Sequence, residues 1–222
     1  MTTIVALVPM RHHSQRVPGK NYRPLAGRPL YQHIITTLLQ CPEISQVVVD
    51  TDSPIIMLGL QEHFPQVKVL ERPEHLRADS VPMNEILVYD TSQAPADLYL
   101  QTHSTNPLLS ATVISGAIQA LLQSFPAYDS LFSVTRLQTR LWDQLGRAIN
   151  HNPAVLLQTQ DLPPVFEENS CLYIFQRQTL LARRNRLGER PLMYEIPAAQ
   201  AWDIDEEIDF AITEFLMQQT QR

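Results

Sequence analysis

Short apolar runs alternate with helical stretches over the first 137 residues, and this alternation constrains the fold more than any other feature. Runs of aliphatic residues predict strands at 3–9, 46–53, 67–73, 97–105 and 129–137. Between them, apolar spacing and capping signals predict helices at 28–40, 53–64, 80–91 and 110–125, with Ser53 and Ser110 as N-caps. Repeated strand–helix units of this length predict an α/β fold with a mostly parallel sheet flanked by helices.

The pattern changes after about residue 136. The stretches 142–150 and 170–176 are predicted to form a hairpin and added strands, and a last helix is predicted from about Glu206 to Met217. A chain of 222 residues, 44 % hydrophobic, has room for one large domain with a full core. The first apolar run is too short to cross a membrane and lacks a basic segment before it, so no signal peptide is expected.

Charge is distributed unevenly along this acidic chain. The net charge of -6 disfavours a general nucleic-acid or acidic-membrane surface. Five of the 17 lysines and arginines nevertheless lie between residues 11 and 28, with no acid among them: Arg11, Arg16, Lys20, Arg23 and Arg28. They follow the first predicted strand, and ligands of such sheets bind beyond the carboxyl ends of the strands. We therefore predict a phosphate site, with Ser14 as a further donor and without a P-loop or dinucleotide motif.

Several other residues are candidates for the same edge of the sheet. Asp203 and Asp205 stand two apart where the last helix begins, so they either hold one hard cation or cap that helix. Asp50 and Asp52 either line the site or cap the helix after Ser53, and His103 ends the fourth predicted strand. The two cysteines, Cys41 and Cys171, lack a zinc-binding spacing and are expected to be buried thiols of a cytoplasmic protein.

Taken in order, these pieces resemble the cytidylyltransferases that activate acidic sugars, the family of CMP-N-acylneuraminate synthetase and CMP-KDO synthetase. The nucleotide loop of that family is matched by Arg11, Ser14, Pro18, Lys20 and Asn21. Further matches are AGRPLYQHI, VVVDTDSPII and ERPEHLRADS, then QDLPPVFEENSCLYI and the closing DIDEEIDF. The resemblance covers nearly the whole chain, and its last two blocks are the most specific.

The resemblance implies a Rossmann-like fold of the nucleotide-diphospho-sugar transferase type, formed by one cytidylyltransferase domain over 1–222. A hairpin at about 137–175 would serve the sugar site and a homodimer interface. It also implies Mg²⁺-dependent attack of a sugar's anomeric hydroxyl on the α-phosphate of CTP. The resemblance assigns catalysis to Lys20, Arg11 and Asp203, and metal binding to Asp203 and Asp205. It assigns nucleotide binding to Arg11, Ser14, Arg16, Lys20, Asn21, Asp79 and His103. It assigns sugar binding to Thr105, Gln160, Phe166 and Asn169.

The chain also departs from the family pattern. His12 and His13 replace glycines of the loop, Gln15 replaces a lysine, His103 replaces a glutamine, and Thr159 replaces an arginine that serves the sugar carboxylate. These changes leave the acid sugar open, with Arg136, Arg140 or Arg177 as replacement contacts. Two alternatives are a catalytically silent nucleotide-binding relative and a GT-A-type glycosyltransferase, in which DID would act as the metal-binding motif.

Overall fold

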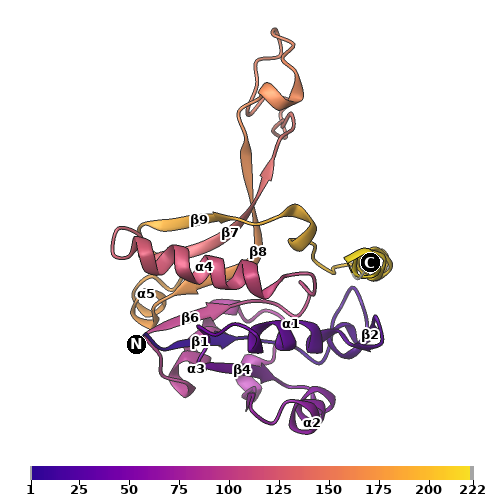
Figure 1. Ribbon diagram of the computed structural model, residues 1–222, viewed down its shortest axis with the longest axis vertical. Coiled ribbons are helices and arrows are strands. Elements are labelled where there is room, and N and C mark those ends of the chain that lie inside the picture. Colours follow the sequence, from indigo (N-terminus) through magenta and orange to yellow (C-terminus); the bar gives the residue numbers. More distant parts are fainter. Residues whose placement is uncertain (1, 221–222) are drawn as a thin grey trace.

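The computed structural model describes residues 2–220, and its centre is a seven-stranded sheet (Figure 1). The strands lie in the order β5-β4-β1-β6-β8-β7-β9. Their bounds are β1 Ile4–Leu7, β4 Gln46–Thr51, β5 Lys68–Glu71, β6 Leu98–Gln101, β7 Ser130–Leu137, β8 Val165–Phe175 and β9 Pro191–Glu195. Only β8 runs against its neighbours, pairing antiparallel with both β6 and β7. The predicted α/β fold with a mostly parallel sheet is confirmed.

The helices cover both faces of this sheet, as alternation of side chains along each strand requires. Ile4, Ala6 and Val8 share one core with α1 (Leu30–Leu39), α2 (Pro54–His63) and α4 (Ala111–Ser124). Val5 and Leu7 point to the opposite face and pack with α3 (Met83–Gln93) and α5 (Arg177–Arg183).

Two of these helices begin at the residues predicted to cap them. The Ser53 hydroxyl accepts from the Ile56 amide, and the Ser110 hydroxyl accepts from the Val113 amide. Both predicted N-caps are thus confirmed, since each serine satisfies an amide that has no partner inside its own helix.

The C-terminal helix α6 (Glu207–Thr220) packs against the segment that follows β1 rather than against the sheet. Phe210 joins Val17, Leu25 and Leu30 in a small separate core. The Phe210 ring also contacts Arg23, whose guanidinium carbon lies 4.4 Å from the ring centre. The short hairpin of β2 (Pro24–Leu25) and β3 (Arg28–Pro29) belongs to this layer. Opposite ends of the chain are thereby held side by side.

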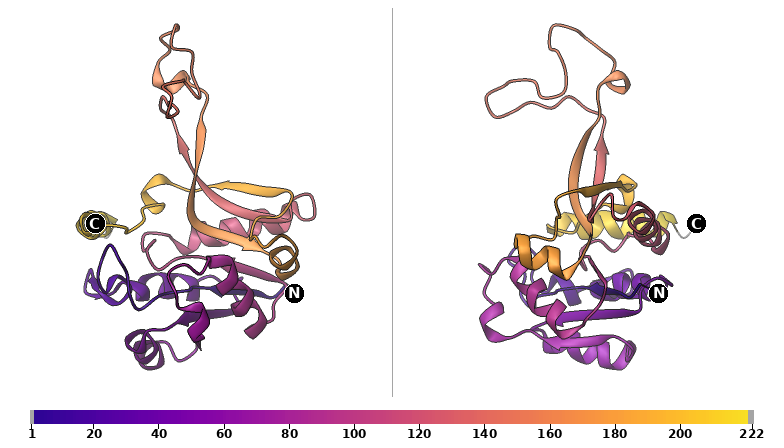
Figure 2. Two further views of the ribbon diagram at one scale, coloured as in Figure 1. Left: turned by 180° about the vertical axis from the view of Figure 1, so that it is seen from behind. Right: turned by 90° about the vertical axis from the view of Figure 1, so that its left-hand side faces the viewer.

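A long arm projects from the body, formed by the outer halves of β7 and β8 and the connection 138–164 between them (Figures 1 and 2). Within this connection an antiparallel bridge joins Trp142 to Ala148, in keeping with the predicted hairpin. Both cysteines are buried free thiols. Within residues 2–220, every helix falls short of the length and apolar character needed to span a bilayer.

Candidate active site

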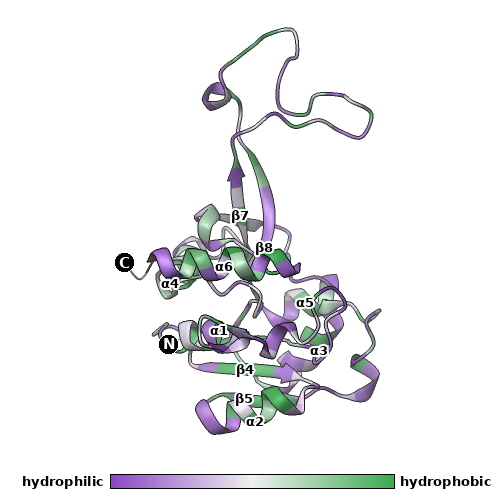
Figure 3. Cartoon of the chain, turned by 90° about the vertical axis from the view of Figure 1, so that its right-hand side faces the viewer, coloured by the Kyte–Doolittle hydropathy of each residue, from purple (hydrophilic) through white to green (hydrophobic). Residues whose placement is uncertain are grey.

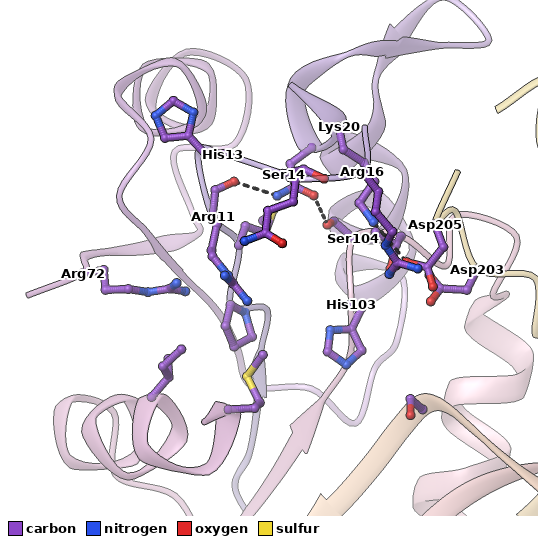
Figure 4. Close-up of a pocket in the computed structure, with 18 residues that line it drawn as sticks. Arg11, His13, Ser14, Arg16, Lys20, Arg72, His103, Ser104, Asp203 and Asp205 are labelled. Carbon is purple, nitrogen blue, oxygen red and sulfur yellow. Dashed lines mark hydrogen bonds and ion pairs between the residues drawn. The ribbon is translucent and has the colours of Figure 1, made fainter. Parts of the chain in front are cut away.

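A pocket of about 430 Å³ opens where β1 and β6 end. The sheet order changes direction between these two neighbouring strands, and open α/β sheets bind ligands at such a point because the loops leaving the strands diverge. Figure 4 shows side chains of the loop after β1, the segment after β6 and the stretch before α6 turned toward one space. Its charged lining consists of Arg11, Arg16, Lys20, Arg72, Asp203 and Asp205.

The loop after β1 turns its cations toward the pocket at Gly19. This residue has φ of 68°, a left-handed conformation open to glycine, and a Cβ there would lie 2.9 Å from the Tyr22 ring. The turn starts a short 3-10 helix and brings Lys20 into the pocket. There Nζ of Lys20 donates to the carbonyl oxygen of Ile204 at 2.7 Å, which joins the loop to the segment before α6.

The base of this loop is fixed by two sets of hydrogen bonds. Asn21 donates from Nδ2 to the Arg11 carbonyl at 2.7 Å and accepts from the Ser104 hydroxyl at 2.8 Å. The backbone N–H of His12 donates to Asp52 Oδ1 at 2.7 Å. Asn21, expected to bind nucleotide, therefore has both ends of its amide engaged by the protein. Asp52 anchors the loop and does not line the pocket.

The DID stretch faces the loop across the pocket. Asp209 accepts from the amides of Asp205 and Glu206, at 2.9 and 2.7 Å, and so fills the capping role that the sequence allowed for Asp205. The Asp205 carboxylate is left free to point into the pocket. Asp203 is exposed by its accessible surface but flanked by neighbouring groups, and this partial desolvation raises the pKa of its carboxyl, while a hydrogen bond from Thr105 lowers it.

Acidic groups pair with the loop cations. Asp205 Oδ1 lies 2.5 Å from a guanidinium nitrogen of Arg16 and 3.4 Å from Nζ of Lys20. Asp79 does not line the pocket; it accepts from Gln15 and from Arg11, which do, and these hydrogen bonds lower the pKa of its carboxyl. Arg16 and Asp79 are largely exposed, so these contacts are weak and readily exchanged for contacts with a ligand.

Arg72 also lines the pocket. Its hydrogen bond to Asp50 shows that the role expected for Asp50 was wrong. Asp50 neither lines the site nor caps α2; it is buried and accepts from Nε of Arg72, whose side chain is 1 % exposed. Asp90 of α3 lies behind Asp50, and burial together with the Asp50 charge raises the pKa of Asp90 to about 9. One proton on Asp90 satisfies two oxygens that otherwise lack partners, Asp90 Oδ1 and Asp50 Oδ2.

His103 extends into the pocket between Arg11 and the DID carboxylates (Figure 4). Burial lowers the pKa of its imidazole to about 4, and the nearby cations Arg186 and Lys20 act in the same direction. The ring is therefore neutral at physiological pH. His12 has a different role, because its ring bonds the Ser53 hydroxyl and stacks on Tyr22.

Asp203 and Asp205 fit a hard divalent cation. Residues 2–220 contain no group of three or more His, Cys, Asp or Glu side chains placed to hold a metal. A pair of carboxylates leaves further coordination positions to phosphate oxygens and water, which is how Mg²⁺ is usually bound beside a nucleotide. Partial desolvation raises the pKa of the Asp203 carboxyl, and a cation beside it would favour its ionised form.

The residues expected to bind sugar fall into two groups. Thr105 lines the pocket, while Asn169 lies on β8, where its amide accepts from Ser133 and donates to Thr135. Gln160 and Phe166 lie along the arm, outside this pocket. Gln160 instead lines a second hollow of about 500 Å³ at the base of the arm, together with Thr135, Arg136, Gln138 and Glu195.

Other lining residues carried no assignment from the sequence. Met83 and Ile86 of α3 give the pocket an apolar wall. Ser170 also lines it, with φ of 58° at an irregularity in the pairing of β7 with β8. Proline at 82 before an apolar helix gave a signal for α3, but nothing local indicates the unusual backbone at Ser170.

Comparison with known proteins adds independent findings. Residues 5–220 match the profile of the family described as cytidylyltransferase. The chain is 28 % identical over 233 residues to the CMP-N,N'-diacetyllegionaminic acid synthase of Legionella pneumophila, covering 98 % of this chain and 97 % of that protein. It is 27 % identical over 220 residues to N-acylneuraminate cytidylyltransferase A of Danio rerio, covering 95 % of this chain and 50 % of that protein.

A solved structure supports the fold. The solved structure of CMP:2-keto-3-deoxy-manno-octonic acid synthetase complexed with CTP superposes on this chain with a TM-score of 0.73 at 18 % identity. The superposition covers 99 % of this chain and 100 % of the other.

Proposed function

Because this chain belongs to the cytidylyltransferase family, we propose that it transfers CMP from CTP to an acidic sugar of the nonulosonic or ulosonic class. One observation carries the proposal: a cationic loop and a carboxylate pair, 183 or more residues apart in the sequence, face each other across one pocket. The cations suit the charge of a triphosphate, and the carboxylates suit the cation that accompanies it. The names of the relatives point to sugar acids as acceptors.

The proposed reaction is a displacement at the α-phosphorus of CTP. The anomeric hydroxyl oxygen of the sugar forms a bond to this phosphorus, and the bond from the phosphorus to the oxygen leading to the β-phosphate breaks. Pyrophosphate leaves with that oxygen and the bonding electrons, and the hydroxyl proton passes to water. Lys20 and Arg11 stabilise the negative charge that develops on the phosphate oxygens.

The remaining residues of the site have supporting roles in this proposal. Arg16 exchanges its exposed contact with Asp205 for a phosphate oxygen, and Ser14 donates to the same group. In the same way, Arg11 exchanges its contact with Asp79 for a phosphate oxygen. Arg72, Met83 and Ile86 form the part of the pocket best suited to the planar base. Asp203 and Asp205 would hold Mg²⁺, which when bound neutralises phosphate charge and orients the groups that react.

Pyrophosphate release tests this proposal. Purified protein is incubated with Mg²⁺, one of four nucleoside triphosphates, and one of a panel of sialic, legionaminic, pseudaminic and KDO acids. We expect release with CTP and one acid, and none without the acid. Tight CTP binding in a separate titration, with no release for any acid, would favour the silent nucleotide-binding relative instead.

We further propose that the chain is a single cytidylyltransferase domain that dimerises through the arm. Large apolar side chains along the arm are exposed, among them Leu145 at 69 % and Leu156 at 91 %. Hydrophobic stretches alternate with hydrophilic ones along the arm (Figure 3). Exposed apolar surface on a projecting segment is typical of an interface with a partner. In a homodimer the arm would bring Gln160 and Phe166 to the sugar. The two free thiols agree with a cytoplasmic location.

Sedimentation analysis of the wild type and of Leu156→Asp tests the dimer. We expect a dimer that the substitution converts to monomer, with Leu58→Asp as the control, because Leu58 is also exposed but lies on α2, away from the arm. A wild-type monomer at micromolar concentration would contradict this assignment.

A further inference from the structure

A chain of three side chains leads from the pocket to a half-buried arginine. His103 Nε2 lies 3.1 Å from Nε2 of Gln101, the last residue of β6. The oxygen of the same Gln101 amide accepts from a guanidinium nitrogen of Arg186, which lies in the connection between α5 and β9. Gln101 is fully buried, so both ends of its amide need partners.

This chain of contacts determines where the proton of His103 resides. A guanidinium only donates hydrogen bonds, so the Gln101 atom facing Arg186 has to be the oxygen. The amide nitrogen therefore faces His103, and it donates also to the Thr102 carbonyl at 3.1 Å. His103 Nε2 has to accept, and in a neutral ring the proton is then on Nδ1. The amide orientation thus follows from the chemistry of the arginine.

The other ring nitrogen of His103 is open to a ligand. Nδ1 has no hydrogen-bond partner among residues 2–220, and it is not one of the enclosed polar atoms that lack a partner. The ring lines the pocket (Figure 4). A fixed N–H at this place favours an oxygen that can only accept, such as that of a phosphate or a carboxylate.

Arg186 itself does not line the pocket. Its guanidinium carbon lies 3.6 Å from the centre of the Tyr173 ring. The Tyr173 hydroxyl donates to Glu168, and this hydrogen bond holds the ring against which the guanidinium packs. The guanidinium is thereby fixed in place by groups that do not line the pocket.

We propose that Arg186 is a positioning residue that acts through Gln101 to hold His103 as an Nδ1–H donor toward an anionic oxygen of a substrate. The inference rests on the proposed function for the identity of that oxygen, a phosphate of the nucleotide or the carboxylate of the sugar. The low pKa of His103 agrees with it, since a protonated ring would carry N–H groups on both nitrogens and would not depend on Gln101.

The tautomer is measured first, by ¹⁵N NMR of histidine-labelled protein without substrates at pH 7.5. The variant His103→Asn assigns the signal among the seven histidines. We expect a protonated Nδ1 and an unprotonated Nε2 in the wild type and in Arg186→Lys, and a mixture of both forms in Arg186→Met. A wild-type ring protonated on Nε2 would overturn the proposal. This measurement needs no catalytic activity, so it stands even where no acid sugar in the panel reacts.

Kinetics then test whether Arg186 acts through His103. Arg186→Met should lower kcat/KM about tenfold, the value expected for one hydrogen bond to a charged oxygen. A rise in KM for CTP identifies a phosphate as the acceptor, and a rise in KM for the sugar identifies its carboxylate. Arg183→Met serves as control, because Arg183 is exposed and its ion-pair partner among residues 2–220 is Glu189. In a His103→Ala background, Arg186→Met should cost less than twofold; an undiminished tenfold loss there would show that Arg186 does not act through His103.

Discussion

Replacing Asp90 with asparagine should change how the stability of this protein depends on pH. Asp90 is buried next to Asp50, and burial with the Asp50 charge raises its pKa from an ordinary 3.8 to about 9. The folded state therefore keeps a proton that the unfolded state loses above about pH 4. This proton stabilises the folded state fully below pH 3.8, and its contribution declines as pH rises toward 9. Asparagine supplies a permanent N–H in place of that proton.

The magnitude follows from the slope of this linkage. One proton held by the folded state alone lowers the free energy of unfolding by about 1.4 kcal/mol for each pH unit. Between pH 6 and pH 8, the wild type should lose about 3 kcal/mol relative to Asp90→Asn. The slope is close to constant over this range because pH 6 to 8 lies above the unfolded pKa of 3.8 and below the folded pKa of about 9.

Urea unfolding of both proteins at pH 6, 7 and 8 and constant ionic strength measures this difference. Glu85→Gln is the matched control, since it makes the same chemical change on the same helix at an exposed position. We expect the free energy of unfolding of Asp90→Asn, minus that of the wild type, to rise with pH. The same difference for Glu85→Gln should stay constant. A constant difference for Asp90→Asn would refute the reasoning, because it would mean that Asp90 is ionised beside Asp50 and Arg72.

Three further predictions concern the pocket. Asp205→Asn should lower metal-dependent turnover at least a hundredfold while circular dichroism stays unchanged, and turnover like that of the wild type would remove the metal assignment. Lys20→Ala should weaken CTP binding in calorimetry about tenfold or more and change the KM for the sugar little; an unchanged CTP affinity would contradict the role of the loop. Gly19→Ala should destabilise the loop by about 1–2 kcal/mol and weaken CTP binding, since its φ of 68° disfavours a side chain and the Cβ would meet Tyr22. Gly146→Ala, with φ of 73° but open space around the Cβ, should affect stability alone, and equal losses of CTP affinity would exclude the Tyr22 contact as the cause.

The parts of this structure that the sequence predicted depend on local signals. Ser53 and Ser110 precede apolar helical spacings, and each caps the helix predicted to follow it. The cationic loop after the first strand was predicted from composition and position, because the end of a parallel strand has a known place in such folds. Lys20 and Arg16 do line the pocket.

The parts that the sequence did not predict depend on contacts between distant residues. Asp50 and Asp52 look alike in sequence, yet Asp50 is buried against Arg72 while Asp52 holds the His12 amide. Asp50 lies within β4 and Asp52 just past its end at Thr51, so strand alternation does not separate their roles, and the packing of Asp90 on α3 against Asp50 is not visible in the sequence. The sequence likewise does not distinguish Asp209, four residues after Asp205, as the residue that caps α6, because several acids stand together there.

The arm is the clearest case of such a limit. Its strands were predicted as a hairpin, but nothing in the sequence indicates that β8 inserts antiparallel between β6 and β7. Residues of one specific motif are consequently divided, with Asn169 near the pocket and Gln160 on the arm. In the dimer proposed above, the arm of a second copy would bring both groups to one site.

The central claim is that a sugar oxygen attacks the α-phosphorus of CTP in this pocket. The most direct test uses the acid sugar that gives pyrophosphate release, with ¹⁸O in its anomeric hydroxyl, and mass spectrometry of both products. The account predicts one ¹⁸O atom in the CMP-sugar and none in pyrophosphate. Unlabelled CMP-sugar, or ¹⁸O in pyrophosphate, would show that a different bond is broken and would contradict it.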